Sequence, residues 1–85
     1  MNNGKDEYRT KDLGEASAIF SQGIKTLHLE KDRTGFYWFV FPNKESFKIA
    51  DLYWSQELQV DAKTYYDAMR NLKDRLFQNV QKENY

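Results

Sequence analysis

A four-residue turn between two strand-like runs constrains this chain more than any other feature. Residues 25–30 (KTLHLE) alternate apolar with polar side chains, and residues 36–41 (FYWFVF) are aromatic and β-branched, so both runs predict β-strands. Asp32-Arg-Thr-Gly35 lies between them, with the Asp that starts a type I turn and a Gly suited to the left-handed residue that follows it. The turn predicts an antiparallel hairpin in which Asp32 faces Phe36.

The register set by this turn sorts the hairpin side chains onto two faces. Counting back from the turn gives the pairs Leu29 with Phe39, Leu27 with Phe41, Glu30 with Trp38, and His28 with Val40. Paired residues share a face of the sheet, so one face carries the apolar set Leu27, Leu29, Tyr37, Phe39 and Phe41. The other face carries Thr26, His28, Glu30, Trp38 and Val40. A slip of one residue would exchange the two sets.

Three amphipathic segments predict helices around this hairpin. The first covers residues 11–22, where Thr10 is a suitable N-cap and Gly23 supplies a left-handed end. A short edge strand over residues 8–10 precedes it. Both elements come before the hairpin in the chain.

The other two helices follow the hairpin. Pro42 has no N–H to donate to a ladder, so we expect the strand to stop before it and Asn43 to cap a helix over residues 44–58. The predicted buried stripe of that helix is Phe47, Ala50, Trp54 and Leu58. Asp61 is the predicted N-cap of the last helix, which extends to about Gln81 on the spacing of Ala62, Tyr65, Met69, Leu72, Leu76 and Val80.

Together these elements predict an α+β domain in the order (β)αββαα. A small antiparallel sheet, made of the hairpin and an added edge strand, packs with three helices. The 85 residues leave room for one core, and no linker-like stretch divides them. We expect a single domain over residues 8–81, a disordered N-terminal tail over residues 1–7 and a C-terminal tail over residues 82–85.

Composition narrows the classes of function. The sequence has 13 basic and 13 acidic residues, one His and no Cys. It therefore has no disulfide, thiolate nucleophile or cysteine zinc site, and it carries none of the motifs of phosphate-binding loops or metalloproteases. We expect no enzyme activity, no catalytic residues, no cofactor and no metal. The longest apolar run, residues 36–41, is far shorter than the roughly 20 residues that span a bilayer, so we expect a soluble, cytoplasmic protein without a membrane partner.

The single imidazole lies beside a carboxylate on one strand face. Thr26, His28 and Glu30 alternate along the first hairpin strand, and a His next to a Glu is a candidate metal pair or acid–base pair. The polar side of a half-buried strand explains the same pattern and is favoured. His28 remains a candidate binding residue.

The last predicted helix holds the one basic stretch of the chain. Residues 70–82 contain Arg70, Lys73, Arg75 and Lys82 against Asp74 alone. One interpretation is contact with an anionic partner such as nucleic acid. The other is complementarity to the negative end of the helix dipole, which is favoured because a net charge of zero leaves little surplus for neutralising phosphates.

Trp38 and Val40 are the least ordinary residues of the predicted hairpin. The register places both on the sheet face opposite the main aromatic core. A helix, the N-terminal strand or a partner could cover them, and burial within the monomer is slightly favoured. On an open face, the same residues would suit a protein interface or the stacking of bases in single-stranded nucleic acid.

Several segments carry a resemblance across most of the chain. They are Glu7-Tyr-Arg-Thr-Lys-Asp-Leu13, the run 36–41, and Leu52-Tyr-Trp-Ser-Gln-Glu-Leu-Gln-Val-Asp61 leading into Tyr65-Tyr-Asp-Ala-Met-Arg-Asn-Leu-Lys-Asp-Arg-Leu76. From Tyr8 to about Phe77 the sequence resembles a family of small bacterial and phage-associated proteins catalogued as a domain of unknown function. The resemblance implies a compact α+β module of prokaryotes and their mobile elements, with no catalytic residues to transfer.

The leading functional hypothesis is a small non-enzymatic module that binds another protein or itself. Its predicted anchors are Trp38 and Val40, with Tyr53 or Tyr66 as further candidates. A phage or mobile-element accessory protein acting on a host protein fits this description. The alternative is a nucleic-acid-binding accessory protein that uses Arg70, Lys73, Arg75 and Lys82 for phosphates and Trp38 for stacking.

Overall fold

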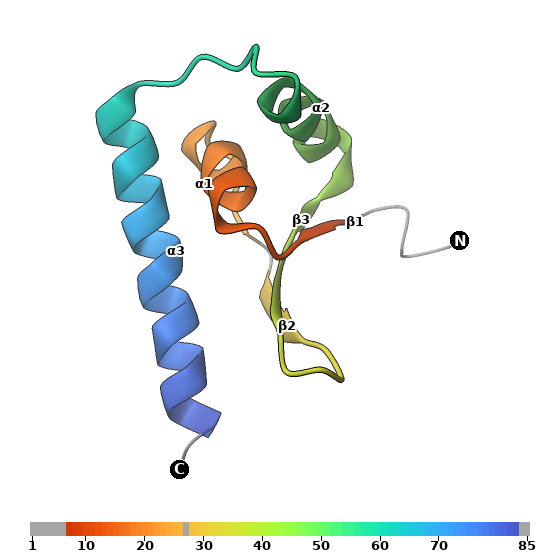
Figure 1. Ribbon diagram of the computed structural model, residues 1–85, viewed down its shortest axis with the longest axis vertical. Coiled ribbons are helices and arrows are strands. Elements are labelled where there is room, and N and C mark those ends of the chain that lie inside the picture. The colour runs from red at the N-terminus through yellow and green to blue at the C-terminus, as the bar shows by residue number, and fades with distance from the viewer. Residues whose placement is uncertain (1–6, 27, 84–85) are drawn as a thin grey trace.

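The computed structural model describes residues 7–26 and 28–83, with side chains up to residue 81. In chain order the elements are β1 (Glu7–Thr10), α1 (Leu13–Ser21), β2 (His28–Lys31), β3 (Tyr37–Pro42), α2 (Asn43–Trp54) and α3 (Ala62–Glu83). The predicted α+β class and the order (β)αββαα are confirmed (Figure 1). Of the two predicted tails, residues 1–6 and 84–85 lie outside the described residues, whereas Glu7 belongs to β1 and residues 82–83 continue α3.

The three strands form an antiparallel sheet with β3 in the centre, in the order β1-β3-β2. The predicted hairpin register is confirmed by three pairs, His28 with Val40, Leu29 with Phe39, and Glu30 with Trp38. The backbone N–H of Asp32 donates to the carbonyl of Phe36 at 2.8 Å, and Gly35 has the expected left-handed φ of 94°. The predicted pair of Leu27 and Phe41 lies outside the described residues.

The predicted edge strand forms and pairs with β3 on the side away from β2. Tyr8 faces Phe41, Arg9 faces Val40, and Glu7 faces Pro42. The prediction that the strand stops before Pro42 is therefore wrong. Proline is tolerated at the last position of a strand, where the missing N–H interrupts no further ladder.

Two predicted helix caps are also wrong, because Thr10 belongs to β1 and Asn43 is already part of α2. Thr10 is held in β1, so α1 begins later, with Asp12 as its cap accepting the backbone N–H of Glu15 at 2.8 Å. Asn43 is already helical, and Pro42 precedes it without any side-chain cap hydrogen bond. The N-cap predicted at Asp61 is confirmed, since its carboxylate accepts the N–H of Thr64 at 3.0 Å.

Helix α2 ends earlier than predicted and exposes a different face. It stops at Trp54, and Gln56 takes a left-handed φ of 64°. Phe47 and Trp54, predicted on the buried stripe, are 61% and 59% exposed. Ala50 of that stripe is buried as predicted, and Ser46 is buried beside it. Both side chains are small and let the helix approach α1 closely.

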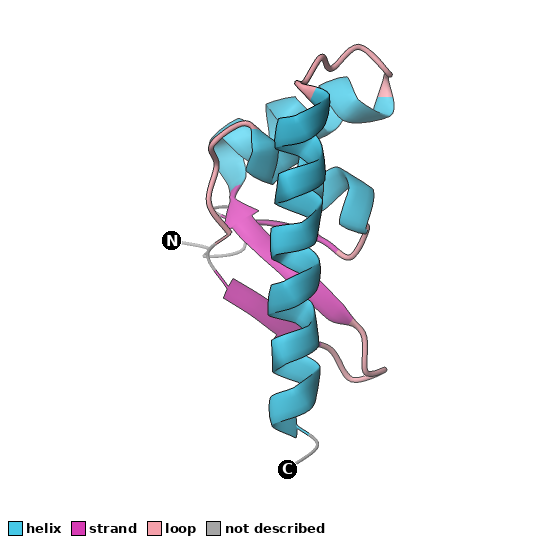
Figure 2. Cartoon of the chain, turned by 90° about the vertical axis from the view of Figure 1, so that its left-hand side faces the viewer, coloured by secondary structure: helices cyan, strands magenta, loops and turns pink. Residues whose placement is uncertain are grey.

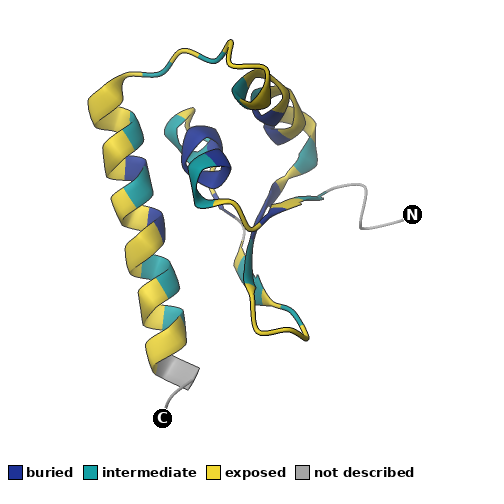
Figure 3. Ribbon diagram, viewed as in Figure 1, coloured by how far each residue is buried: buried dark blue, intermediate teal, exposed yellow. Residues whose placement is uncertain are grey.

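The core lies on one face of the sheet. Figure 1 shows α1 between α3 and the sheet, and Figure 2 shows α3 crossing in front of the strands. The buried cluster joins all of these layers and consists of Ala16, Ile19, Phe39, Phe41, Ala50 and Leu72. The molecule is flat, with extents of 41 × 37 × 19 Å, so each outer helix keeps a wide exposed face (Figure 3).

Candidate interaction surfaces

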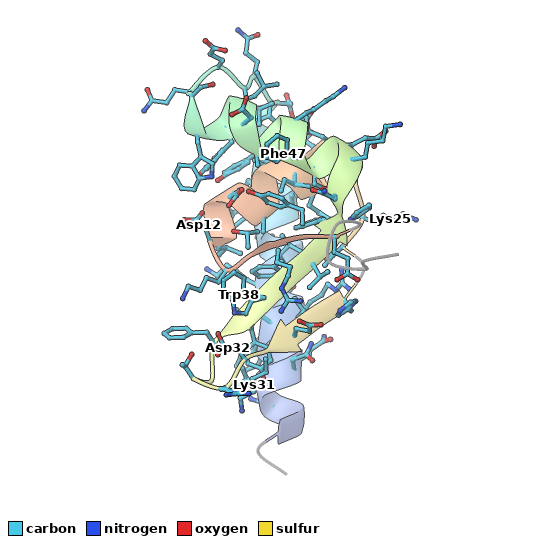
Figure 4. All side chains as sticks on the ribbon, turned by 90° about the vertical axis from the view of Figure 1, so that its right-hand side faces the viewer. Asp12, Lys25, Lys31, Asp32, Trp38 and Phe47 are labelled. Carbon is cyan, nitrogen blue, oxygen red and sulfur yellow. The ribbon has the colours of Figure 1, made fainter. Side chains whose placement is uncertain are left out.

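The outer sheet face holds Trp38 through its neighbours in the monomer. Its indole Nε1 donates to Asp32 Oδ2 at 2.7 Å. The Lys11 ammonium lies 5.3 Å from the centre of the Trp38 rings, and the Arg9 guanidinium lies 6.0 Å from it. Asp32 lies beside this half-buried side chain (Figure 4). The cations of Arg9 in β1 and of Lys11 just after it also border the indole.

Asp32 is the hub of the hairpin turn as well as the partner of Trp38. Its Oδ1 accepts the backbone N–H of Thr34 at 2.9 Å, the Thr34 hydroxyl at 2.6 Å and the N–H of Phe36 at 3.0 Å. The hydrogen bond from the Thr34 hydroxyl, followed by that from the Trp38 indole, holds the pKa of Asp32 far below its ordinary range. The carboxylate therefore stays charged at neutral pH and fixes the turn and the indole together.

Val40 is fully buried. Its cross-strand neighbours are Arg9 on β1 and His28 on β2. Arg9 also forms an ion pair with Glu30, so a charged link crosses the central strand on this face. Val40 is consequently a covered residue rather than an exposed anchor.

His28 and Glu30 form a surface pair. His28 Nε2 lies 3.3 Å from Glu30 Oε2, and both side chains are partly exposed. Hydrogen bonds from His28 and then from Arg9 lower the pKa of Glu30. Within the described ranges, no three His, Cys, Asp or Glu side chains are grouped as a metal ion would require.

The basic residues of α3 lie on the other side of the sheet from Trp38. Leu72 of α3 packs in the core with Phe39, and side chains alternate along β3, so Trp38 points away from α3. Arg70 and Lys73 are exposed, whereas Arg75 is half-buried. The side chain predicted to contribute at Lys82 lies outside the described part of the chain.

The C-terminal half of α3 borders two adjoining hollows that the sequence did not reveal. One, of about 370 Å³, is lined by Leu13, Lys73, Leu76, Phe77 and Val80. The other, of about 310 Å³, lies toward the hairpin and is lined by Lys11, Leu13, Gly35, Phe36, Tyr37, Phe39, Leu76 and Val80. Leu13, Leu76 and Val80 line both, and we call the two hollows together the α3 groove.

The rim of the α3 groove carries exposed aromatic side chains. Phe77 is 61% exposed and Phe36 is 56% exposed, with the Lys11 ammonium 4.6 Å from the centre of the Phe36 ring. Helical spacing predicts that Phe77 lies next to the apolar stripe of α3. It does not show that this stripe extends beyond the end of α1, the helix that covers it. Figure 1 shows that α3 is longer than α1 and continues past it toward the turn of the β2–β3 hairpin.

A second feature missed from the sequence is a buried carboxylate beneath β1. Glu15 is 4% exposed and accepts hydrogen bonds from the hydroxyls of Tyr8 and of Thr10, the latter at 2.7 Å. Nearby, the Tyr65 hydroxyl donates to the Gly14 carbonyl at 3.3 Å. A Cβ atom at position 14 would lie 2.5 Å from the Tyr53 hydroxyl, so any larger residue there would require the Tyr53 side chain to move. The Glu15 carboxylate joins β1 to α1, and the Tyr65 hydroxyl joins α3 to α1, so we assign both groups a structural role.

The family model described as Domain of unknown function (DUF5659) matches residues 5–78, so the chain belongs to this family, as its resemblance implied. No curated protein and no solved structure matches the chain. Within the part of the chain that the structure describes, no helix has both the length and the apolar character needed to cross a membrane.

Proposed function

We propose that this member of the DUF5659 family is a non-enzymatic protein-interaction module whose binding surface is the α3 groove. The observation that carries the proposal is an apolar hollow bordered by a Phe77 side chain left 61% exposed. Large apolar side chains gathered around a concavity are typical of sites where another protein docks.

The apolar surface of α3 continues outward from the core, which supports this choice. Leu72 is fully buried, Leu76 is half-buried and Val80 is 39% exposed, so the same helical stripe emerges gradually from the protein. A partner that covers Val80 and Phe77 would extend the existing core without rearranging it. Binding would then remove apolar area from water at little cost in ordering.

The proposal moves the anchors away from the outer sheet face. Val40 is buried, and Trp38 is already bound by Asp32 and bordered by two cations. Tyr66, a further predicted anchor, lies on α3 and is 56% exposed, but it does not line the α3 groove. The narrower hypothesis of a phage or mobile-element protein acting on a host protein stays a prediction.

Nucleic-acid binding through Trp38 and the basic helix places greater demands on a ligand. Trp38 faces away from α3, so one strand would have to pass around the sheet to meet both Trp38 and Arg70. The net charge of zero also provides little general attraction for phosphates. We therefore give protein binding precedence.

The test is affinity capture from a lysate with three baits. The wild-type protein is compared with a groove variant, Phe77→Ser with Val80→Ser, and with a control variant, Phe47→Ser with Trp54→Ser on α2. All four substituted side chains are exposed, so we expect both variants to fold, which circular dichroism checks. A protein retained by the wild type and the control but lost by the groove variant supports the proposal. Equal retention by all three baits, or none by the wild type, contradicts it.

A further inference from the structure

We infer that the α3 groove accepts an acidic amphipathic helix from a different protein, a partner class that rests on the proposed function. The inference starts from four exposed residues on one face of α3, namely Tyr66, Arg70, Lys73 and Phe77. Their spacing of four, three and four residues places them in one row along the helix. We call this row the α3 stripe, and it runs beside the groove at Lys73 and Phe77.

The stripe alternates aromatic surface with positive charge. The Arg70 guanidinium lies 5.9 Å from the centre of the Tyr66 ring. Among the described residues, neither Arg70 nor Lys73 forms an ion pair with a carboxylate, whereas Lys63 is paired with Asp67 at 2.9 Å. Arg70 shares a hollow with Asp67 and Asp74, whereas Lys73 lines the groove, where the described lining has no carboxylate. Neither cation is committed to an ion pair within the described ranges, so both can meet carboxylates of a partner.

The groove beside the stripe has the same sign of charge. Among the described residues, its charged lining side chains are Lys11 and Lys73, both cationic. The remaining lining is mainly aliphatic and aromatic, so an apolar side chain can enter while carboxylates of the partner meet the lysines at the edge. Charge complementarity of this kind favours an acidic partner and disfavours a basic one.

The same charges argue against a second copy of this chain as the occupant. In a symmetric dimer the patch would meet itself, because each partner presents the same surface. Arg70 and Lys73 of one protomer would then face the same two cations of the other. A different protein with carboxylates at these positions avoids that repulsion.

The dimensions indicate the length of the docking segment. From Tyr66 to Phe77 the helix rises about 16 Å, or three turns. A partner helix of similar length, about 10–14 residues, would match the stripe, with more than one of its apolar side chains entering the hollow of about 370 Å³ between Leu13 and Phe77.

The direct test uses a defined synthetic probe. A fluorescein-labelled peptide of about 14 residues carries Leu at positions i, i+3, i+4, i+7 and i+11 and Glu at most others, and its binding is followed by fluorescence anisotropy. Matched peptides replace every Glu with Lys, or every Leu with Ser. We expect the acidic peptide to bind roughly five- to twentyfold more tightly than the basic one, as two exposed charge pairs allow, and the Ser peptide not to bind.

A charge-reversal pair of variants connects the binding preference to the stripe. Arg70→Glu with Lys73→Glu should invert the preference toward the basic peptide. The control variant Lys44→Glu with Lys48→Glu reverses two exposed charges on α2. It should keep the preference of the wild type for the acidic peptide. Raising the salt concentration should weaken the preference for the acidic peptide.

Several outcomes would overturn the inference. These are equal affinity for the acidic and basic peptides, inversion by the α2 control, tighter binding of a single-stranded oligonucleotide, or a dimer in sedimentation that Phe77→Ser dissociates. The proposed function fails separately, through the capture experiment. A protein lost by the groove variant alone, together with no preference for the acidic peptide, would keep the interaction module and reject the acidic partner.

Discussion

Glu15 joins the first strand to the first helix from inside the protein. Its carboxylate accepts hydroxyl hydrogen bonds from Tyr8 and Thr10 of β1, while its own backbone N–H donates to Asp12. A buried polar group is tolerated when its hydrogen bonds are made and is costly when they are not. Two hydroxyl side chains and one helix cap therefore meet at a single residue.

Replacing Glu15 should be among the most damaging single changes in the N-terminal region. Glu15→Ala leaves two hydroxyls without their acceptor, and we expect it to lower the free energy of unfolding by about 2–3 kcal/mol. Glu15→Gln keeps the shape and one acceptor, so its loss should be smaller. Urea denaturation followed by circular dichroism measures both, and an unchanged midpoint for Glu15→Ala would contradict the role given to this carboxylate.

Tyr8 and Tyr53 should ionise above the ordinary range of tyrosine during an alkaline titration. Burial, followed by the hydrogen bond to Glu15, raises the pKa of Tyr8 above its ordinary value near 10, and burial with the neighbouring Tyr65 raises that of Tyr53. A raised pKa means that the native state keeps its proton longer, so stability is intact below pH 10 and falls as the pH rises above it. Absorbance at 295 nm should show a late step in tyrosine ionisation, and Tyr8→Phe should reduce its amplitude by one tyrosine. Simultaneous ionisation of all tyrosines in the folded protein would refute this.

Among the elements, α2 shows how a helix end is decided by one backbone conformation. The helix stops at Trp54, and the N–H groups of Glu57 and Leu58 both donate to the Leu52 carbonyl, at 2.9 and 3.2 Å. This closure requires the left-handed φ of Gln56, a conformation that a side chain disfavours. The predicted extension to Leu58 missed it because Gln carries no left-handed signal.

Gln56→Gly should therefore stabilise the protein. Glycine removes the steric cost of the left-handed conformation, about 1–2 kcal/mol. It also raises the conformational entropy of the unfolded chain, which offsets part of this gain, so we expect a net stabilisation of about 0.5–1 kcal/mol. The opposite change, Gly35→Ala at φ 94°, should destabilise the hairpin. Thermal unfolding compares both with the wild type. A loss of stability in Gln56→Gly would show that the Gln56 side chain makes stabilising contacts that outweigh its steric cost.

Across the whole molecule, the flat shape divides α3 into a covered part and an uncovered part. Its buried residues, Ala68 and Leu72, face the core, whereas Phe77 beyond them is mostly exposed. Figure 3 shows the same division along the helix. One continuous amphipathic helix thus serves the core with one half and borders the α3 groove with the other.

This division predicts a contrast between two large-to-small substitutions on one helix. Leu72→Ala opens a cavity in the core and should cost about 2–5 kcal/mol. Phe77→Ala should change the stability by no more than about 0.5 kcal/mol, because most of its side chain already meets water. Guanidinium denaturation of the two variants provides the measurement. A large loss in Phe77→Ala would mean that Phe77 belongs to the core rather than to a binding surface.

Much of the fold could be predicted because its signals are local. Asp32 and Gly35 set the turn and thereby the register of the four described residue pairs between β2 and β3. The apolar spacing from Ala62 onward predicted α3, and Asp61 capped it as expected. These features depend on hydrogen bonds and conformations within a few residues, which the sequence specifies directly.

The candidate site could not be predicted in the same way. Trp38 and Val40 were placed on the correct face, but whether they were covered depended on Arg9, about thirty residues away, whose side chain pairs with Glu30 across the central strand. The α3 groove likewise brings together Leu13, Phe36 and Leu76 from three separate parts of the chain.

What the sequence alone determined is therefore the set of elements, the hairpin register and the polar composition of the surface. Only the tertiary structure decided which face of α2 is buried, what lies over Trp38, and that Phe77 is left beside an open groove. The physical reason is that burial is a property of the space between elements. A periodic stripe shows which side of a helix is apolar, but the length and position of its neighbours decide how much of that stripe they cover.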